Sequence, residues 1–194
     1  MNFLAHIYLS GDDDLIKIGN FMADGIRGKG YQLMPERIRK GVLLHREIDT
    51  FTDAHPTFRQ STKRLHENYH HYAGVIVDVF YDHFLARNWT QYSNERLEAY
   101  VENFYRSLHE NHELLTPKTK QILPVMQQYN WLLSYRETQG LARILSQMDY
   151  RTNHISRMTH SINDLVEHYG EFEQEFTTFF AELRSFAEEK RAAL

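Results

Sequence analysis

Residues 75 to 86 read VIVDVFYDHFLA, and this stretch decides how the chain must fold. From Ala73 to Ala86, every residue is apolar, aromatic or glycine except Asp78, Asp82 and His83. A helix that is apolar around its whole circumference is normally buried. The two carboxylates are four residues apart, so they project from the same face of such a helix. The stretch therefore predicts a buried central helix that carries charged groups into the core.

The rest of the chain also has a helical pattern. The 194 residues include 4 Pro and 9 Gly, and strand-like alternation is weak throughout. Prolines and polar capping residues mark several helix starts, such as Pro35, Pro56, Ser93 and Thr116-Pro117. We expect a single all-α domain over residues 1–194 with seven to nine helices, at about residues 12–27, 35–54, 56–72, 75–89, 94–115, 118–133 (bent near Pro124), 137–148 and 153–194.

Composition limits the possible functions. A hydrophobic content of 42% suffices for one sizeable core, and a net charge of −4 does not indicate a nucleic-acid partner. The lack of cysteine excludes disulfides, thiolate nucleophiles and cysteine-bound zinc. No stretch reaches the length of a membrane span, and the N-terminus MNFLAHIYLSGDDD has no basic region typical of a signal peptide. We therefore expect a cytoplasmic protein without a membrane partner.

Residues 66 to 70 match the zinc-protease pattern His-Glu-x-x-His, but their surroundings argue against a metal site. On a helix, Phe58, Leu65 and Tyr69 would form the inward stripe, whereas Glu67 would point toward the polar side. The following residues, HYAGVIVDV, do not continue the pattern as the metzincin class of zinc proteases does. We interpret the pattern as an exposed helix surface.

Charged residues at inward positions indicate a different site. His45 and Asp49 are four residues apart, at positions where the pattern of residues 38–49 calls for aliphatic side chains. Buried carboxylates need cations or hydrogen-bond donors, so they indicate either salt bridges to arginine or a bound metal ion. Imidazole and carboxylate groups are the ligands expected for a divalent ion. The predicted metal ligands are His6, His45, Asp49, Asp82 and His83.

Five segments resemble the acyl carrier protein phosphodiesterases: MNFLAH at 1–6, GNFMADGIRG at 19–28, GVLLHREIDTFTDAHP at 41–56, VDVFYDHFLARNW at 77–89 and WLLSYR at 131–136. The resemblance implies an all-helical relative of the HD phosphohydrolases that removes phosphopantetheine from holo acyl carrier protein, a reaction linked to fatty acid biosynthesis and lipid metabolism. It also implies a divalent metal ion, typically manganese, with magnesium or iron as alternatives. The Asp82-His83 order is the reverse of the His-Asp pair that names the HD superfamily.

Within such a reaction, the remaining polar residues receive predicted roles. Asp24 and Asp78 are candidate catalytic carboxylates, and Arg27, Arg46 or Arg136 are candidates to hold the phosphate. A basic segment between residues 27 and 46 is a candidate docking face for the acidic carrier protein, with Arg37, Arg39 and Lys40 at its centre.

Two other functions remain open at this point. One is an HD-like phosphohydrolase that acts on a nucleotide or another small phosphodiester. The other is a helical binding module without catalysis, in which the inward charges are buried salt bridges.

Overall fold

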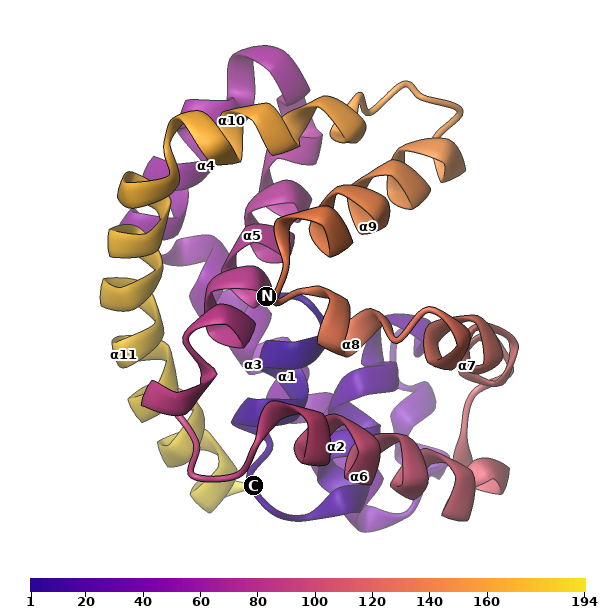
Figure 1. Ribbon diagram of the computed structural model, residues 1–194. Coiled ribbons are helices and arrows are strands. Elements are labelled where there is room, and N and C mark those ends of the chain that lie inside the picture. Colours follow the sequence, from indigo (N-terminus) through magenta and orange to yellow (C-terminus); the bar gives the residue numbers. More distant parts are fainter.

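The computed structural model describes residues 1–194, and all of its regular elements are helices (Figure 1). This confirms the all-α prediction. Eleven α-helices, more than the seven to nine expected, run as α1 (Phe3–Leu9), α2 (Asp14–Met22), α3 (Glu36–Ala54), α4 (Pro56–Tyr69), α5 (Ala73–Arg87), α6 (Leu97–Glu110), α7 (Pro117–Gln128), α8 (Trp131–Ser134), α9 (Thr138–Arg151), α10 (Ser161–Glu167) and α11 (Tyr169–Ala193). Short 3₁₀ turns join them, among them η1 (Ala23–Gly25) and η6 (Met158–His160).

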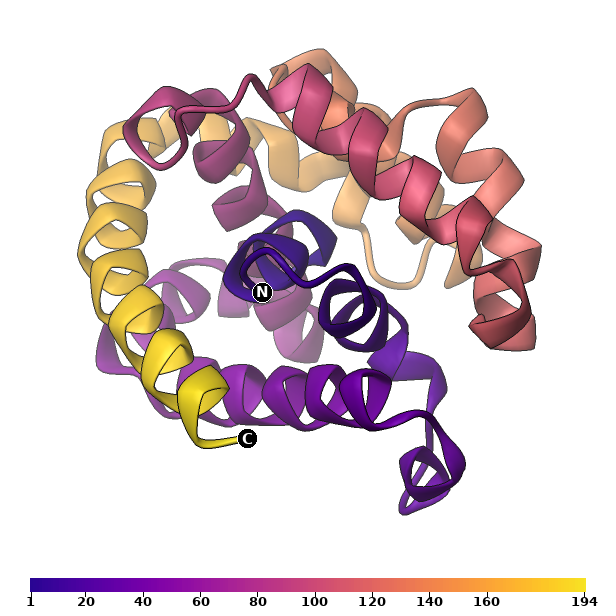
Figure 2. The same ribbon diagram turned by 90° about the horizontal axis from the view of Figure 1, so that it is seen from below.

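Helix α5 lies at the centre of the molecule, as its sequence predicts. Eleven of its fifteen residues are buried, including Asp82 and His83. Figure 2 shows α1 in the middle of the fold, with α3 and α11 on the outside. A single hydrophobic cluster of 46 buried residues extends from Met1 to Ala187, so all the helices pack around one core.

Helices α2 and α3 pack unusually closely, and glycines make this possible. A Cβ atom at Gly19 would lie 2.2 Å from the carbonyl oxygen of Ile38, and one at Gly41 would lie 2.2 Å from that of Ile16. No side chain fits at such distances, so only glycine allows the two backbones to approach this far. The close crossing brings the end of α2 beside the middle of α3, where His45 lies.

Several predicted helices differ from the structure. The segment expected at 118–133 is interrupted at Asn130, whose φ of 42° separates α7 from α8. The segment expected to be helical from residue 153 onward begins only at Ser161 and breaks again before Tyr169. Asn153, His154 and Arg157 adopt positive φ, and the buried Asp149 carboxylate stabilises their turn by accepting hydrogen bonds from Ser156 and Thr159.

Helix α6 also starts later than the sequence indicates. It begins at Leu97, and the hydroxyl of Ser93 accepts the N–H of Glu95 in the preceding turn instead of capping the helix. The predicted cap at Thr116 is confirmed, since its side chain accepts the N–H of Thr119. No helix of the protein is both long and apolar enough to cross a bilayer.

Candidate metal centre

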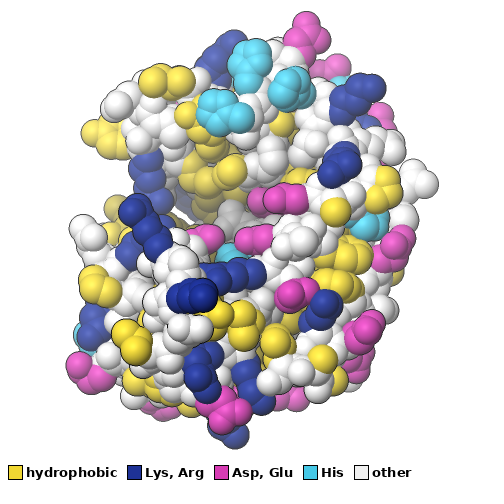
Figure 3. Space-filling model, turned by 180° about the vertical axis from the view of Figure 1, so that it is seen from behind, with side chains coloured by type: hydrophobic (Ala, Val, Ile, Leu, Met, Phe, Trp, Pro, Cys, Tyr) yellow, Lys and Arg dark blue, Asp and Glu magenta, His cyan; other side chains and the backbone are white.

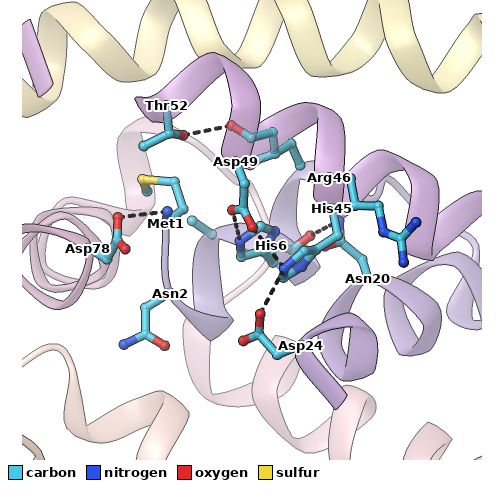
Figure 4. Close-up of polar contacts among 12 residues, drawn as sticks. Met1, Asn2, His6, Asn20, Asp24, His45, Arg46, Asp49, Thr52 and Asp78 are labelled. Atoms are coloured by element: carbon cyan, nitrogen blue, oxygen red, sulfur yellow. Dashed lines mark hydrogen bonds and ion pairs between the residues drawn. The ribbon is translucent and has the colours of Figure 1, made fainter. Parts of the chain in front are cut away.

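Three ligand-type side chains from two helices meet at one end of a cleft. His6 comes from α1, and His45 and Asp49 come from adjacent turns of α3 (Figure 4). His6 Nε2 lies 3.3 Å from Asp49 Oδ1, and His45 Nε2 lies 3.1 Å from Asp49 Oδ2. Asp24, in η1, approaches from another side and places Oδ1 3.2 Å from His45 Nε2. We call these four residues the His–Asp cluster.

Asn20 fixes the orientation of the His45 ring. Its side-chain amide donates to the carbonyl oxygen of His6 at 3.0 Å and to Ser10 Oγ at 2.9 Å. Because the amide nitrogen is used in this way, Asn20 Oδ1 is the acceptor for His45 Nδ1 at 3.1 Å. His45 Nδ1 therefore carries a proton, and Nε2 faces Asp24 and Asp49. Metal-binding histidines are commonly oriented in this way by a partner on the other ring nitrogen.

His6 has nitrogen atoms without hydrogen-bond partners. Its side chain is 3% exposed, and neither Nδ1 nor Nε2 makes a hydrogen bond, since Nε2 reaches Asp49 at ion-pair distance without hydrogen-bond alignment. The ring stacks on His45 with centroids 4.0 Å apart. An unpaired buried polar group costs about 1–3 kcal/mol and calls for an explanation. A metal ion at Nε2 would supply one.

The two histidines have opposite electrostatic environments. Burial, together with the neighbouring His45, lowers the pKa of His6 to about 4. Burial alone would also lower the pKa of His45, but hydrogen bonds from its ring to Asp24 and Asp49 outweigh this effect and raise it to about 9. The contact with His45 lowers the pKa of Asp24; burial alone would raise the pKa of Asp49, but its contacts with both histidines lower it. Without a metal ion, the cluster thus combines ionised carboxylates with one neutral imidazole, His6, and one protonated imidazole, His45, which would lose its Nε2 proton on binding a metal ion.

This donor set fits a divalent cation. The ligand atoms of His6, His45 and Asp49 all lie within 4.8 Å of one another. Two imidazole nitrogens with one or two carboxylate oxygens suit manganese, iron or zinc. The unpaired nitrogens of His6 and the hydrogen bond that aims His45 Nε2 support the same assignment.

The cluster opens into a cleft of about 340 Å³. One wall carries four carboxylates, those of Asp24, Asp49, Asp53 and Asp78. The other wall is formed by α8 and α9 and includes Trp131, Tyr135, Ile144, Gln147, Met148 and Arg151. Figure 3 shows a hollow with acidic side chains at its inner edge, hydrophobic ones above them and Lys and Arg along its lower rim.

Asp82 and His83 do not belong to the His–Asp cluster. The two oxygens of Asp82 accept the N–H groups of Leu4 at 2.7 Å and Ala5 at 3.1 Å, in the first turn of α1. Burial raises the pKa of Asp82 to about 7, and the amide of Leu4 opposes this shift. His83 contacts the carbonyl oxygen of Tyr135 at 2.7 Å and the Tyr169 hydroxyl at 2.8 Å. The structure therefore does not bring these two predicted ligands to the cluster, and their contacts hold helices together.

Asp78 lies in the same cleft but away from the two histidines. Its Oδ1 is 2.8 Å from the amino group of Met1, and the carboxylate is 24% exposed (Figure 4). Burial raises the pKa of Asp78, whereas the positive amino group opposes the shift. Asp78 thus anchors the segment that carries Asn2 and Phe3 into the cleft lining.

The predicted phosphate-binding arginines lie outside the cleft lining. Arg46 points away from the cluster and donates to the carbonyl oxygens of Gly28 at 2.7 Å and Ile26 at 3.4 Å, so it braces the loop after η1. Arg27 is exposed and makes no ion pair. The one arginine that lines the cleft is Arg151, which sequence reasoning did not select.

The three central residues of the basic segment differ in exposure: Arg37 is exposed, whereas Arg39 and Lys40 are half-buried. Arg37 is 64% exposed and pairs with Asp13 at 3.2 Å, and Lys40 pairs with Glu36 at 3.5 Å. Arg39 has no ion-pair partner, and the nearby Leu33 is 95% exposed. The His66 and His70 side chains are also exposed, which supports the interpretation of HENYH as a helix surface.

Sequence reasoning missed Asn20 and the wall of α8 and α9. Asn20 is the one polar side chain in the apolar stretch IGNFM, and it is buried. A polar residue in such a stretch could have indicated that Asn20 has buried hydrogen-bond partners. The wall carried no such signal, because Trp131, Ile144 and Met148 look like ordinary core residues.

Comparison with known proteins identifies the family. The family model described as "Acyl carrier protein phosphodiesterase" matches residues 1–183. Relatives named acyl carrier protein phosphodiesterase include those of Photorhabdus laumondii, 32% identical over 98% of this chain and 96% of theirs, and Enterobacter sp., 31% identical over 98% and 100%. The Salmonella agona relative is 31% identical over the full length of both chains. No solved structure gives a significant match. The chain therefore belongs to the acyl carrier protein phosphodiesterase family.

Proposed function

We propose that the protein is a metal-dependent phosphodiesterase that hydrolyses the bond between holo acyl carrier protein and its phosphopantetheine group. The observation that carries the proposal is the His–Asp cluster beside a cleft, in a chain whose relatives are named acyl carrier protein phosphodiesterase. The two alternatives have less support. The relatives are not named for nucleotide substrates, and His6, whose pKa of about 4 leaves it neutral, does not form a salt bridge with Asp49.

The charge of the cleft supports a role for a cation. Four carboxylates line it, against Arg151, the Met1 amino group that pairs with Asp78, and the His45 ring. A phosphodiester is itself an anion, so a cation bound among these carboxylates would reduce its repulsion from them. We assign His6, His45 and Asp49 as the residues that hold a divalent ion. Manganese is our main candidate for this ion, and magnesium and iron are the alternatives. Such an ion lowers the pKa of water and neutralises charge on phosphoryl oxygens.

The proposed reaction breaks one phosphorus–oxygen bond. A water oxygen bonds to phosphorus while the bond from phosphorus to the serine oxygen of the carrier breaks, and the serine oxygen takes up a proton. Asp24 is placed to accept the proton of the water, because it is 63% exposed at the cleft and only Oδ1 contacts His45. The products are apo carrier and free phosphopantetheine.

We further propose that the carrier docks on the basic segment next to the cleft. Arg27, Lys29, Arg37, Arg39 and Lys40 lie within fourteen residues of one another, and Glu36 is the one acid among them. Acyl carrier proteins are small and acidic, so opposite charges would steer the encounter. Arg27 and Lys29 lie in the loop after η1, and Arg37, Arg39 and Lys40 lie in the first turns of α3. Because η1 also carries Asp24 of the cleft lining, this stretch of chain connects the docking surface to the site.

An intact-mass assay tests the proposed reaction. Purified holo acyl carrier protein is incubated with the enzyme in manganese or in EDTA. We expect the carrier to lose the mass of one phosphopantetheine in manganese alone. Asp49→Asn and His45→Ala should abolish this loss, whereas His66→Ala, in the exposed HENYH segment, should match the wild type. A carrier of unchanged mass with both manganese and magnesium would refute the proposal.

A further inference from the structure

The wall of the cleft opposite the carboxylates is formed mainly by one face of α9. Four residues of α9 line the cleft at helical spacing: Ile144, Gln147, Met148 and Arg151. Side chains at i, i+3, i+4 and i+7 share one face of a helix, so this wall is a continuous stripe. Trp131, the first residue of α8, and Tyr135, which directly follows α8, extend this wall.

The chemistry of this wall differs from that of the His–Asp cluster. It contains no carboxylate, and its apolar members are interrupted by one amide, Gln147, and one guanidinium, Arg151. The Arg151 guanidinium lies 5.4 Å from the centre of the Trp131 ring, in cation–π contact, so it is partly ordered although exposed. An apolar surface with a few hydrogen-bonding groups is typical of a site for a neutral organic ligand.

A ligand that fills the cleft must therefore have two unlike parts. The end at the His–Asp cluster meets imidazole and carboxylate groups, suited to a cation-bound anion such as a phosphate. The part along α9 meets methyl, aromatic, amide and guanidinium groups. Pantetheine matches the second part, because its chain consists of methylene groups, a dimethyl-substituted carbon and two amides. The cleft volume of about 340 Å³ is within the usual range for small-molecule sites.

We propose that the α9 stripe, with Trp131 and Tyr135, binds the pantetheine arm of the substrate and is the specificity surface of the enzyme. This rests on the proposed function for the identity of the ligand. Ile144, Met148 and Trp131 pack against the aliphatic part of the arm. Gln147 and Arg151 donate hydrogen bonds to its amide carbonyl groups.

Pantetheine itself, which lacks the phosphate, is the probe that tests the proposal. Its binding is measured without added metal by tryptophan fluorescence and calorimetry; the other tryptophan, Trp89, is 3% exposed and outside the cleft lining. We expect wild-type protein to bind pantetheine and Met148→Glu to bind it at least tenfold more weakly. Ser146→Glu adds the same charge on the exposed side of α9 and should leave the affinity unchanged.

A second variant keeps the test valid if Met148→Glu folds poorly. Arg151 is exposed, so Arg151→Glu should fold normally and also weaken pantetheine binding. Equal affinity in wild type, Arg151→Glu and Ser146→Glu, or no binding by wild type at millimolar pantetheine, would overturn the proposal. If the wild type binds pantetheine but leaves holo carrier intact, the binding site stands and the proposed reaction fails.

Discussion

At the residue scale, the site depends on one buried amide. Asn20 connects three groups: it accepts from His45 Nδ1 and donates to the His6 carbonyl oxygen and to Ser10 Oγ. It is fully buried, so none of these groups has water as an alternative partner. Asn20 thereby ties α1, α2 and α3 together at the point where the two histidines meet.

Replacing Asn20 should therefore weaken metal binding more than stability alone explains. We expect Asn20→Ala to reduce manganese affinity by about 10–100-fold, as removal of ligand-orienting partners does, and to destabilise the fold by about 1–3 kcal/mol. Ser10→Ala is the matched control, because it breaks the same network without touching His45. Calorimetric titration with manganese compares the two. Equal affinities in both variants would mean that Asn20 does not orient His45.

For Asp82, we predict a loss of stability rather than a loss of metal binding. Its carboxylate binds two amides of the first turn of α1, where the helix has free N–H groups and a positive end. We expect Asp82→Ala to destabilise the protein by about 2–4 kcal/mol, since it leaves buried amides unpaired. Asp49→Ala, at a 44% exposed carboxylate, should instead remove manganese binding with little loss of stability. Chemical denaturation and metal titration of both variants check this. A stable Asp82→Ala variant that binds no manganese would restore Asp82 as a ligand.

The sequence allowed part of this site to be predicted. His6, His45, Asp49 and Asp24 were recognisable because each is a polar residue in an apolar stretch or near a helix end. The same reasoning placed Asp82 and His83 in the site, because an inward charge is visible in a sequence whereas its partner is not. Asp82 is satisfied by backbone amides 77 and 78 residues away, and backbone amides have no sequence signature.

At the element scale, the crossing of α2 and α3 sets the geometry of the site. Gly41 lies one turn before His45 and faces α2. A Cβ atom added at Gly41 would lie 2.7 Å from the backbone nitrogen of Asn20. The sequence predicted both helices, but the contact between them could not be read from periodicity. The turn that precedes α10 was also missed, because the positive φ values at 153, 154 and 157 depend on side-chain bonds to Asp149.

A single methyl group should therefore disturb the crossing. We expect Gly41→Ala to force α2 and α3 apart, to destabilise the fold by about 2–4 kcal/mol and to lower manganese affinity, because overpacking shifts the backbone. Gly170→Ala, in the first turn of α11, meets no atom within 4 Å and should be neutral or stabilising by up to about 1 kcal/mol. Thermal denaturation of both variants tests this. If Gly41→Ala melts like the wild type, close packing at this crossing is not required.

At the scale of the whole molecule, the charges are divided between two surfaces. The cleft is lined by carboxylates, whereas exposed Lys and Arg side chains of the basic segment lie next to it in the chain. A cation-dependent site thus lies beside a surface suited to an acidic protein. The net charge of −4 gives no indication of this separation, which becomes visible once the helices are placed.

Charge reversal on the basic segment should affect docking rather than chemistry. We expect Arg37→Glu combined with Arg39→Glu to raise the KM for holo acyl carrier protein about tenfold at low salt, with a smaller change in kcat, and added salt should reduce the difference. Lys63→Glu combined with Arg143→Glu is the control, since both residues are exposed and outside the segment. Steady-state kinetics at two ionic strengths distinguishes them. An unchanged KM would place docking elsewhere.

The central claim is that His6, His45 and Asp49 hold a divalent metal ion, and diffraction from crystals grown with manganese tests it most directly. Data collected at the manganese absorption edge give an anomalous difference map that locates the ion without reference to activity. We predict one strong peak bounded by His6 Nε2, His45 Nε2 and the Asp49 carboxylate, and no such peak in Asp49→Asn crystals. A peak at another group of residues, or none at saturating manganese, would contradict the account.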